Sequence, residues 1–258
     1  MSTSRAAFSS AKRIVVKVGS SSISGANATK IDALVSALAA SHAEGREVIL
    51  VSSGAIATGL PLFSLESRPD DLPTSQALAA VGQSRLIARY QDQLEKFGII
   101  AGQVLLTSGD LEAEETRANA RRAMDRLLEL RVLPIVNEND TVATAEIRFG
   151  DNDRLAALVA VLVDADALVL LSDVDALYTA PPSQPGATRI TDVAFEDDLS
   201  SIEIGGTSTG VGTGGAVTKV SAAKLANAAG IDVLLTSTDN VSKALAGENV
   251  GTLFESAK

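Results

Sequence analysis

Short apolar runs alternate with segments of helical periodicity along almost the whole chain, and this alternation restricts the fold more than any other feature. Strand-like runs cover residues 13–18, 47–53, 99–107, 132–136, 167–173 and 231–237, and helical periodicity covers residues 30–45, 76–97, 110–130, 152–163 and 218–230. Strands that are separated by helices pair in parallel, because the helix returns the chain to the same end of the sheet. Only 3% of the residues are aromatic, so the core must consist of Ala, Val, Leu and Ile, which suits a sheet covered by helices. The sequence therefore predicts an α/β fold with a mainly parallel sheet.

The length and charge of the chain restrict its organisation and its partners. The 258 residues show neither an internal repeat nor a shift in composition, which predicts a single domain over residues 1–258. The net charge of −10 argues against nucleic acid or a membrane surface as a partner, so an anionic substrate needs local positive charge. The chain has no cysteine, no signal-peptide pattern and no uncharged apolar run of membrane-spanning length. We therefore expect a cytoplasmic protein without disulfides or a catalytic thiol.

Three segments are predicted to be loops. Residues 60–75 and residues 174–186 carry prolines and no periodicity. Residues 200–215 contain six glycines together with Ser and Thr, a composition that cannot pack a core. This third segment is either a slack linker or a loop that binds a ligand.

The stretch from residue 136 to residue 155 carries more polar side chains than folding requires. An apolar strand leads into it and a helical pattern leads out, so its polar groups collect at a strand end and at a helix start. In an open α/β sheet these are ligand-binding positions. Either Asp151 or Asn152 is also expected to cap the helix that follows. The acidic and amide-bearing residues of the stretch are Asn137, Glu138, Asn139, Asp140, Asp151, Asn152 and Asp153.

Lys17 lies near the end of an apolar strand, where its charge needs compensation. It could extend its ammonium group into solvent from an edge strand. Alternatively, the Gly-Ser-Ser-Ser sequence that follows leaves backbone N–H groups free to bind an anion, and the lysine supplies a charge suited to phosphate. The next strand ends in Ser52, Ser53 and Gly54, and Ser53 could be an ordinary helix cap or part of a site. Two such strand ends in neighbouring βα units suggest one shared site.

The glycine loop before residue 216 matches known nucleotide motifs incompletely. Residues 210–215 fit the spacing G-x-G-x-x-G, but no strand directly precedes them, and Asp232 begins the next strand instead of ending it. The Walker spacing is also missing, because Lys219 lies four residues past the last glycine. Lys219 occupies the first turn of a helix, where the helix dipole disfavours a cation. Its position is easier to explain if an anion is shared between Lys219 and the backbone N–H groups.

The lack of suitable side chains narrows the chemistry. His42 is the only histidine, and it lies outside every motif, so we interpret it as a surface or structural residue. A catalytic thiol, a Ser-His nucleophile and a His-based metal site are therefore disfavoured. A carboxylate that attacks a phosphoryl group needs no general base, because it is already an anion at neutral pH.

Taken together, these motifs resemble the amino acid kinase family over essentially the whole chain. The resemblance is carried, in order, by VVKVGSSS, VSSGAIATG, AAVGQSRL, VNENDTVATAEIRFGDNDRLAALVA, LLSDVDALYTA and GTGGAVTK. It implies a three-layer αβα sandwich that transfers the γ-phosphoryl group of ATP, with Mg²⁺, to the side-chain carboxylate of L-glutamate in the first step of proline biosynthesis. The N-terminal part would bind the amino acid, and the part from about residue 165 would bind the nucleotide.

The resemblance also implies a role for each motif residue. Lys17 and Lys219 would neutralise the transferring phosphoryl group, and Asp153 would hold both lysines in position. Glutamate would be bound by Ser53, Gly54, Asp140 and Asn152. The nucleotide would be bound by Ser172, Asp173, Thr213, Gly214, Gly215 and Lys219.

Some implications of the resemblance concern assembly and regulation. Family members form homodimers or homotetramers, and proline acts on them as a feedback inhibitor. Many carry a C-terminal PUA domain that this sequence lacks, either as a natural short form or through truncation. The competing hypotheses are a kinase of the same fold that acts on another carboxylate, a carbamate or a nucleotide, and a non-catalytic module that senses an amino acid. The two phosphate-directed lysines argue against the sensing module.

Overall fold

A computed structural model describes residues 3–65, 67, 69–142, 152–180, 183–197, 199 and 215–257 of the chain. The strands are β1 (Arg13–Val18), β2 (Glu47–Ser52), β3 (Ala101–Leu106), β4 (Leu133–Glu138), β5 (Ala167–Ser172), β6 (Leu177–Tyr178), β7 (Arg189–Ile190), β8 (Asp192–Val193), β9 (Asp232–Ser237) and β10 (Thr252–Phe254). The α-helices are α1 (Thr3–Ser10), α2 (Lys30–Ala43), α3 (Ala55–Gly59), α4 (Leu72–Glu95), α5 (Ser108–Glu112), α6 (Glu114–Glu129), α7 (Asn152–Leu162), α8 (Ala216–Ala228) and α9 (Val241–Leu245). Short 3-10 helices are η1 (Ser20–Ser22), η2 (Gly25–Asn27), η3 (Leu60–Phe63), η4 (Asp140–Val142) and η5 (Thr238–Asn240).

Eight of the strands form one sheet in the order β3-β4-β2-β1-β5-β9-β10-β8. All neighbours in this sheet are parallel except β9 and β10. The predicted α/β class and the mainly parallel sheet are therefore confirmed. Strand β1 is central: the chain continues from it to β2 on one side and later reaches β5 on the other. Such a reversal of direction leaves space for a ligand beyond the carboxyl ends of the strands.

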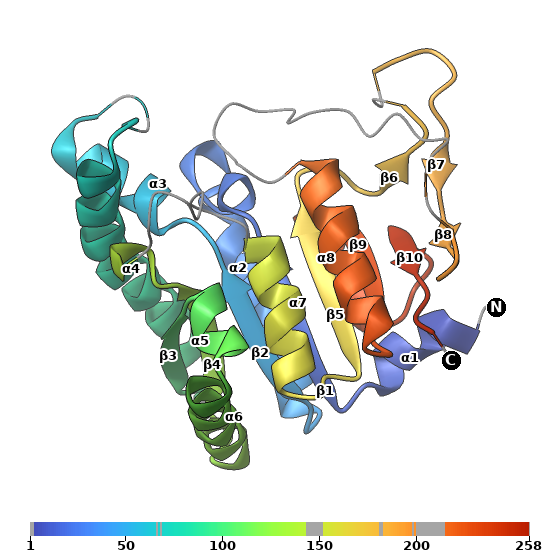
Figure 1. Cartoon of the computed structure of the whole chain (residues 1–258), viewed down its shortest axis with the longest axis horizontal. Helices are drawn as coiled ribbons and strands as arrows, with labels where there is room; N and C mark the ends of the chain where they lie inside the picture. Colours follow the sequence, from blue (N-terminus) through green and yellow to red (C-terminus); the bar gives the residue numbers. More distant parts are fainter. Residues whose placement is uncertain are drawn as a thin grey trace.

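The sheet is covered by helices on both faces, which gives three layers (Figure 1). Successive side chains of a strand point to opposite faces, so Val15 and Lys17 of β1 face one layer, whereas Ile14 and Val16 face the other. The core on the face of Val15 contains α7 and α8, and the core on the face of Ile14 contains α2 and α4. In Figure 1, α7 and α8 lie side by side in front of the sheet and α2 lies behind it. The cores are built mainly from Ala, Val, Leu and Ile, as the composition predicts.

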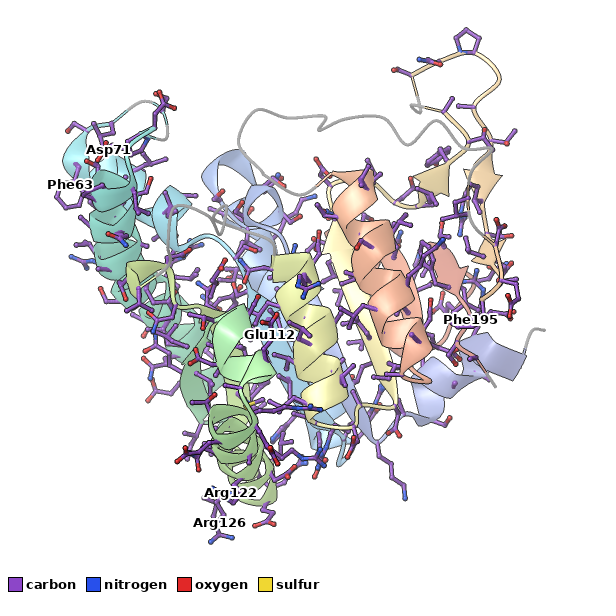
Figure 2. The ribbon with its side chains drawn as sticks, viewed as in Figure 1. Phe63, Asp71, Glu112, Arg122, Arg126 and Phe195 are labelled. Atoms are coloured by element: carbon purple, nitrogen blue, oxygen red, sulfur yellow. The ribbon has the colours of Figure 1, made fainter. Side chains whose placement is uncertain are left out.

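Several element boundaries differ from those predicted. Residues 72–75 belong to helix α4 and not to a loop, because Asp71 accepts a hydrogen bond from the backbone N–H of Thr74 and Pro73 lies in the first turn, where proline is tolerated. Figure 2 shows Asp71 at this end of α4. The predicted helix over residues 110–130 is two helices, because Ala113 between α5 and α6 has extended backbone angles. The predicted loop at residues 174–186 contains β6, which pairs with β7 just beyond the loop.

Helices α1 and α9 were not predicted, and the buried Arg46 links them. Its guanidinium group donates hydrogen bonds to the carbonyl oxygens of Phe8, Ala11 and Leu245. These bonds satisfy a charge that would otherwise be costly to bury. None of the helices within the described ranges is both long and apolar enough to cross a membrane.

Helices α3 and α4 cross with their backbones in close contact at Gly82. A Cβ atom at this position would lie 1.8 Å from the carbonyl oxygen of Ala55 and 2.7 Å from the backbone nitrogen of Gly59. We therefore expect Gly82→Ala to lower the free energy of unfolding by roughly 1–3 kcal/mol or more, measured by urea denaturation, because backbone atoms must move apart. Gly109→Ala is the matched control, since the closest atom to its Cβ would be 3.6 Å away. Equal stability of the two variants would contradict the prediction.

Candidate active site

Lys17, Asp153 and Lys219 form a buried ion-pair cluster at the carboxyl end of β1. The Nζ atom of Lys17 lies 2.6 Å from Oδ1 of Asp153, and the Nζ atom of Lys219 lies 3.1 Å from Oδ2 of the same carboxylate. These side chains are 6%, 1% and 9% exposed, in the order Lys17, Asp153, Lys219. They come from β1 and from the first turns of α7 and α8, so three distant segments meet at one point. The interpretation of Lys17 as a solvent-directed lysine on an edge strand is wrong.

The charges of this cluster fix the ionisation of Asp153. Burial alone would raise the pKa of Asp153, but the ammonium groups of Lys17 and Lys219 outweigh burial and lower this pKa to about 2. The carboxylate is therefore ionised at neutral pH and lies beside Lys219. The anion expected to be shared between Lys219 and the backbone N–H groups of the loop stays a prediction. The three groups together carry one net positive charge, which favours a further anion at this end of the sheet.

The hydroxyl group of Thr218 also contacts this cluster. Its Oγ1 atom lies 3.0 Å from Oδ2 of Asp153 and 2.9 Å from the carbonyl oxygen of Gly215. The sequence motif placed Thr218 in the nucleotide loop without a role of its own. A hydroxyl residue directly before a lysine in the first helical turn was the sequence feature that could have predicted this contact.

The glycine- and serine-rich ends of β1 and β2 lie against each other, as predicted for neighbouring βα units. The backbone N–H of Ser53 donates to the carbonyl oxygen of Val18 at 3.1 Å, and a Cβ atom on Gly54 would lie 3.8 Å from Cα of Ser20. Gly54 has a φ of +114°, which a residue with a side chain rarely adopts. It occupies the N-cap position of α3, so the interpretation of Ser53 as that cap is wrong.

Asp140 and Asn152, two of the predicted glutamate-binding residues, are both buried. Asp140 begins η4 one residue after β4 ends, and Asn152 is the first residue of α7. Within the described residues, the side-chain oxygen of Asn152 has no hydrogen-bond partner, which is unusual for a buried amide. A ligand that donates a hydrogen bond to this oxygen would satisfy it. Asp151 lies outside the described residues, so its expected capping role stays a prediction.

The predicted nucleotide residues are described in part. Ser172 ends β5, and its hydroxyl donates to the carboxylate of Asp173 at 3.0 Å. Gly215 occupies the N-cap position of α8 without a side-chain cap, which leaves N–H groups at the start of this helix available to an anion. Thr213 and Gly214 lie outside the described residues.

His42 lies in the last turn of α2, and its side chain contacts the backbone. The Nε2 atom of His42 lies 3.0 Å from the carbonyl oxygen of Arg131, and burial lowers the pKa of His42. This contact is consistent with a structural residue. Among the residues for which coordinates are described, no group of three His, Cys, Asp or Glu side chains is arranged to hold a metal ion.

A mainly parallel sheet with two buried lysines on one carboxylate, beside glycine-rich strand ends, is typical of an α/β protein that binds an anionic ligand at this end of the sheet. Residues 12–237 match the amino acid kinase family, and the chain belongs to this family.

The relatives found among curated proteins narrow the resemblance further. The glutamate 5-kinase of Clavibacter sepedonicus is 70% identical over 251 residues, which cover 97% of this chain and 97% of that protein. The glutamate 5-kinase of Leifsonia xyli subsp. xyli is 64% identical over 255 residues, covering 98% and 94%. The glutamate 5-kinase of Streptomyces coelicolor is 54% identical over 259 residues, which cover 98% of this chain and 69% of that longer protein.

Proposed function

We propose that this protein transfers the γ-phosphoryl group of ATP to the γ-carboxylate of L-glutamate, giving L-glutamyl 5-phosphate for proline biosynthesis. The observation that carries the proposal is the buried cluster of Lys17, Asp153 and Lys219. Membership of the family and the glutamate 5-kinases at up to 70% identity support the choice of glutamate as acceptor.

The chemistry requires positioning and charge neutralisation more than proton transfer. An oxygen of the glutamate γ-carboxylate forms a bond to the γ-phosphorus of ATP, while the bond from that phosphorus to the β,γ-bridging oxygen breaks and ADP leaves. No proton moves, because the attacking carboxylate is already ionised. The ammonium groups of Lys17 and Lys219 stabilise the negative charge of the transferring group, and Asp153 keeps both groups in place.

The two substrates are assigned to different parts of the chain. The strand-end residues Ser53, Gly54 and Asp140, together with Asn152, bind glutamate, and Asp140 is the partner of its ammonium group. The part from about residue 165, with Ser172, Asp173 and the loop from Thr213 to Lys219, binds ATP. This division follows the family motifs, and the unsatisfied oxygen of Asn152 supports a hydrogen-bonding ligand on the acceptor side.

Mg²⁺ is assigned to the site as an ion that binds together with ATP. The carboxylate of Asp153 is engaged by two lysines, and the described residues contain no cage of three metal-binding side chains. Mg²⁺ commonly keeps several waters and binds through substrate phosphates and one or two carboxylates. That mode fits this site, with Asp173 at the end of β5 as the described carboxylate assigned to the nucleotide half. The metal would reduce the negative charge on the phosphates.

A hydroxamate assay tests the proposed reaction. Hydroxylamine traps an acyl phosphate, so glutamate, ATP and Mg²⁺ are expected to give a coloured hydroxamate, whereas aspartate and acetylglutamate are expected to give little. Activity only with another acceptor would assign a different kinase of the same fold. If glutamate bound without any turnover, the non-catalytic sensing module would be favoured.

Asp140→Ala is expected to raise the KM for glutamate while leaving the KM for ATP within about two-fold, because the contact is the same in the ground state and the transition state. Steady-state kinetics with each substrate varied in turn measure both constants. The control is Asp92→Ala, which removes an exposed carboxylate from α4. A selective rise in the KM for ATP would reassign Asp140 to the nucleotide.

Assembly and regulation stay predictions of the family resemblance. A homodimer or homotetramer would be identified by light scattering, and feedback inhibition by adding proline to the hydroxamate assay.

A further inference from the structure

Helix α4 carries the polar side chains of Tyr90 and Gln83 into a mainly apolar core. Tyr90 is completely buried among leucines, isoleucines and valines of α2, α4, β1 and β2. Gln83, two helical turns earlier, is also buried. A buried polar group is costly unless it is hydrogen-bonded, and apolar side chains of similar size would fill this space.

The hydroxyl group of Tyr90 lies 2.9 Å from Oγ of Ser52, the last residue of β2. Oγ of Ser52 in turn lies 3.1 Å from the carbonyl oxygen of Ser53 and donates to it. Since the hydroxyl hydrogen of Ser52 is used in this way, Tyr90 is the donor in its contact with Ser52. Burial raises the pKa of Tyr90, so the hydroxyl group keeps its proton.

The backbone of Ser53 is thereby held on both sides. Its N–H donates to Val18 of β1, and its carbonyl oxygen accepts from Ser52. The next residue, Gly54, has the positive φ that turns the chain into α3, and α3 packs directly on α4 through Gly82. The position of the Ser53 turn therefore depends on α4 at two points.

Gln83 makes the equivalent contact with the end of β4. Its Oε1 atom accepts a hydrogen bond of 2.6 Å from Nδ2 of Asn137, and Oδ1 of Asn137 accepts from the backbone N–H of Glu138 at 2.9 Å. Both amide groups are buried. Three residues after Asn137 the chain reaches Asp140. The strand-end turn that carries Asp140 is thus fixed to α4 as well.

These contacts lie on the opposite face of the sheet from the phosphoryl-directed lysines. Ser52 and Asn137 share the sheet face of Leu50 and Ile135, which pack with α4, whereas Lys17 shares the face of Val15, which packs with α7. A change at Tyr90 or Gln83 can therefore shift the acceptor turns without disturbing the ion pairs of Asp153.

We infer that Tyr90 and Gln83 are positioning residues for the acceptor, which hold the Ser53 and Asp140 turns in the geometry that binds the amino acid. This inference rests on the proposed function, because it assigns glutamate to those two turns. Neither side chain needs to touch the substrate. A purely structural role would instead lower stability without a preference for one substrate.

Tyr90→Phe tests the inference, because it removes one hydroxyl group and keeps the ring. We expect the KM for glutamate to rise about five-fold or more, the usual effect of one lost buried hydrogen bond, while kcat and the KM for ATP stay within about two-fold. Gln83→Met is expected to give the same pattern. Ser36→Ala is the matched control, since it removes an exposed hydroxyl group on α2 that donates only within its own helix, to the carbonyl oxygen of Asp32 at 2.8 Å, and both KM values should be unchanged.

The double variant Tyr90→Phe/Ser52→Ala identifies the route of the effect. If Tyr90 acts through Ser52, the KM for glutamate of the double variant is expected to be no higher than that of the more affected single variant. Both changes then break the same chain of hydrogen bonds from Tyr90 through Ser52 to Ser53. If the rise in the KM for glutamate in the double variant equals the product of the rises in the two single variants, the action of Tyr90 through Ser52 is overturned. Ser52→Ala alone also tests it from the other end if Tyr90→Phe folds poorly.

The wild-type protein separates this inference from the proposed function. If it forms no hydroxamate with glutamate, the proposed function fails and the inference fails with it. If wild type is active but Tyr90→Phe changes kcat and both KM values equally, or changes only the melting temperature, the inference alone is overturned.

Discussion

Lys219→Ala is expected to lower kcat by on the order of 10² or more, because it removes a positive charge that stabilises the transferring phosphoryl group. The loss should appear in kcat more than in the KM for glutamate, since the charge on the phosphoryl group is redistributed during transfer. The hydroxamate assay under saturating ATP and glutamate measures it. Lys224→Ala is the matched control, because Lys224 lies exposed on the same helix.

Two outcomes would change the assignment of Lys219. An unchanged kcat would remove this lysine from the mechanism. A rise in the KM for ATP with normal kcat would make it a nucleotide-binding group whose contact is equal in the ground and transition states. Lys224→Ala should differ from wild type in neither constant.

Asp153→Asn is expected to affect both activity and stability. The substitution leaves the ammonium groups of Lys17 and Lys219 buried without the carboxylate between them, and removing one partner from a buried ion pair costs about 3–5 kcal/mol. We expect a lower free energy of unfolding by about this amount, and a fall in kcat because the lysines lose their positions. Urea denaturation and the hydroxamate assay measure the two effects.

The pH dependence of this stability difference is a second signature. The pKa of Asp153 is lowered to about 2 in the folded protein, so the carboxylate stabilises the fold fully above its unfolded pKa of about 4. That contribution, about 2 kcal/mol from the pKa shift, is lost as the pH falls from about 4 to 2. The difference between wild type and Asp153→Asn should therefore be constant near neutrality and shrink in this acidic window.

Asp164→Asn is the control for the aspartate substitution. Asp164 also pairs with an arginine, Arg121, at 2.6 Å, but its side chain is 75% exposed and lies just beyond the other end of α7. Exposed ion pairs usually contribute about 0–1 kcal/mol, so little change is expected. Equal losses of unfolding free energy for Asp153→Asn and Asp164→Asn would show that burial of the cluster does not cause its contribution to stability.

The alternation of apolar runs and helical segments was sufficient to predict the six longest strands and most of the longer helices, whereas the two- and three-residue strands β6, β7, β8 and β10 were not predicted. The buried side chains of each strand or helix recur with a regular spacing, and this spacing can be read directly from the sequence. The helix start at Leu72 was missed because Asp71 and Pro73 resemble loop residues, although they are also typical of a helix cap and first turn. Helix α1 was missed because its position depends on the distant Arg46.

The candidate site was predictable only in parts. Lys17, Asp153 and Lys219 stood out individually as charges near apolar elements, but strand order and register, which bring them together, are tertiary properties. Family resemblance supplied that grouping. Tyr90 offered no signal of its own, because an aromatic residue at a helical core position is expected in any amphipathic helix, and only its contact with Ser52 distinguishes it.

The α4 contacts of Ser52 and Asn137 lie on the opposite face of the sheet from Lys17, which has a consequence for enzyme engineering. A variant library confined to the α4 side chains behind the Ser53 and Asp140 turns would explore new carboxylate acceptors while leaving Lys17 and Asp153 in their native arrangement. A library on α7 or α8 would alter acceptor choice and chemistry together. Selection for a new acceptor should therefore begin with the layer of α4.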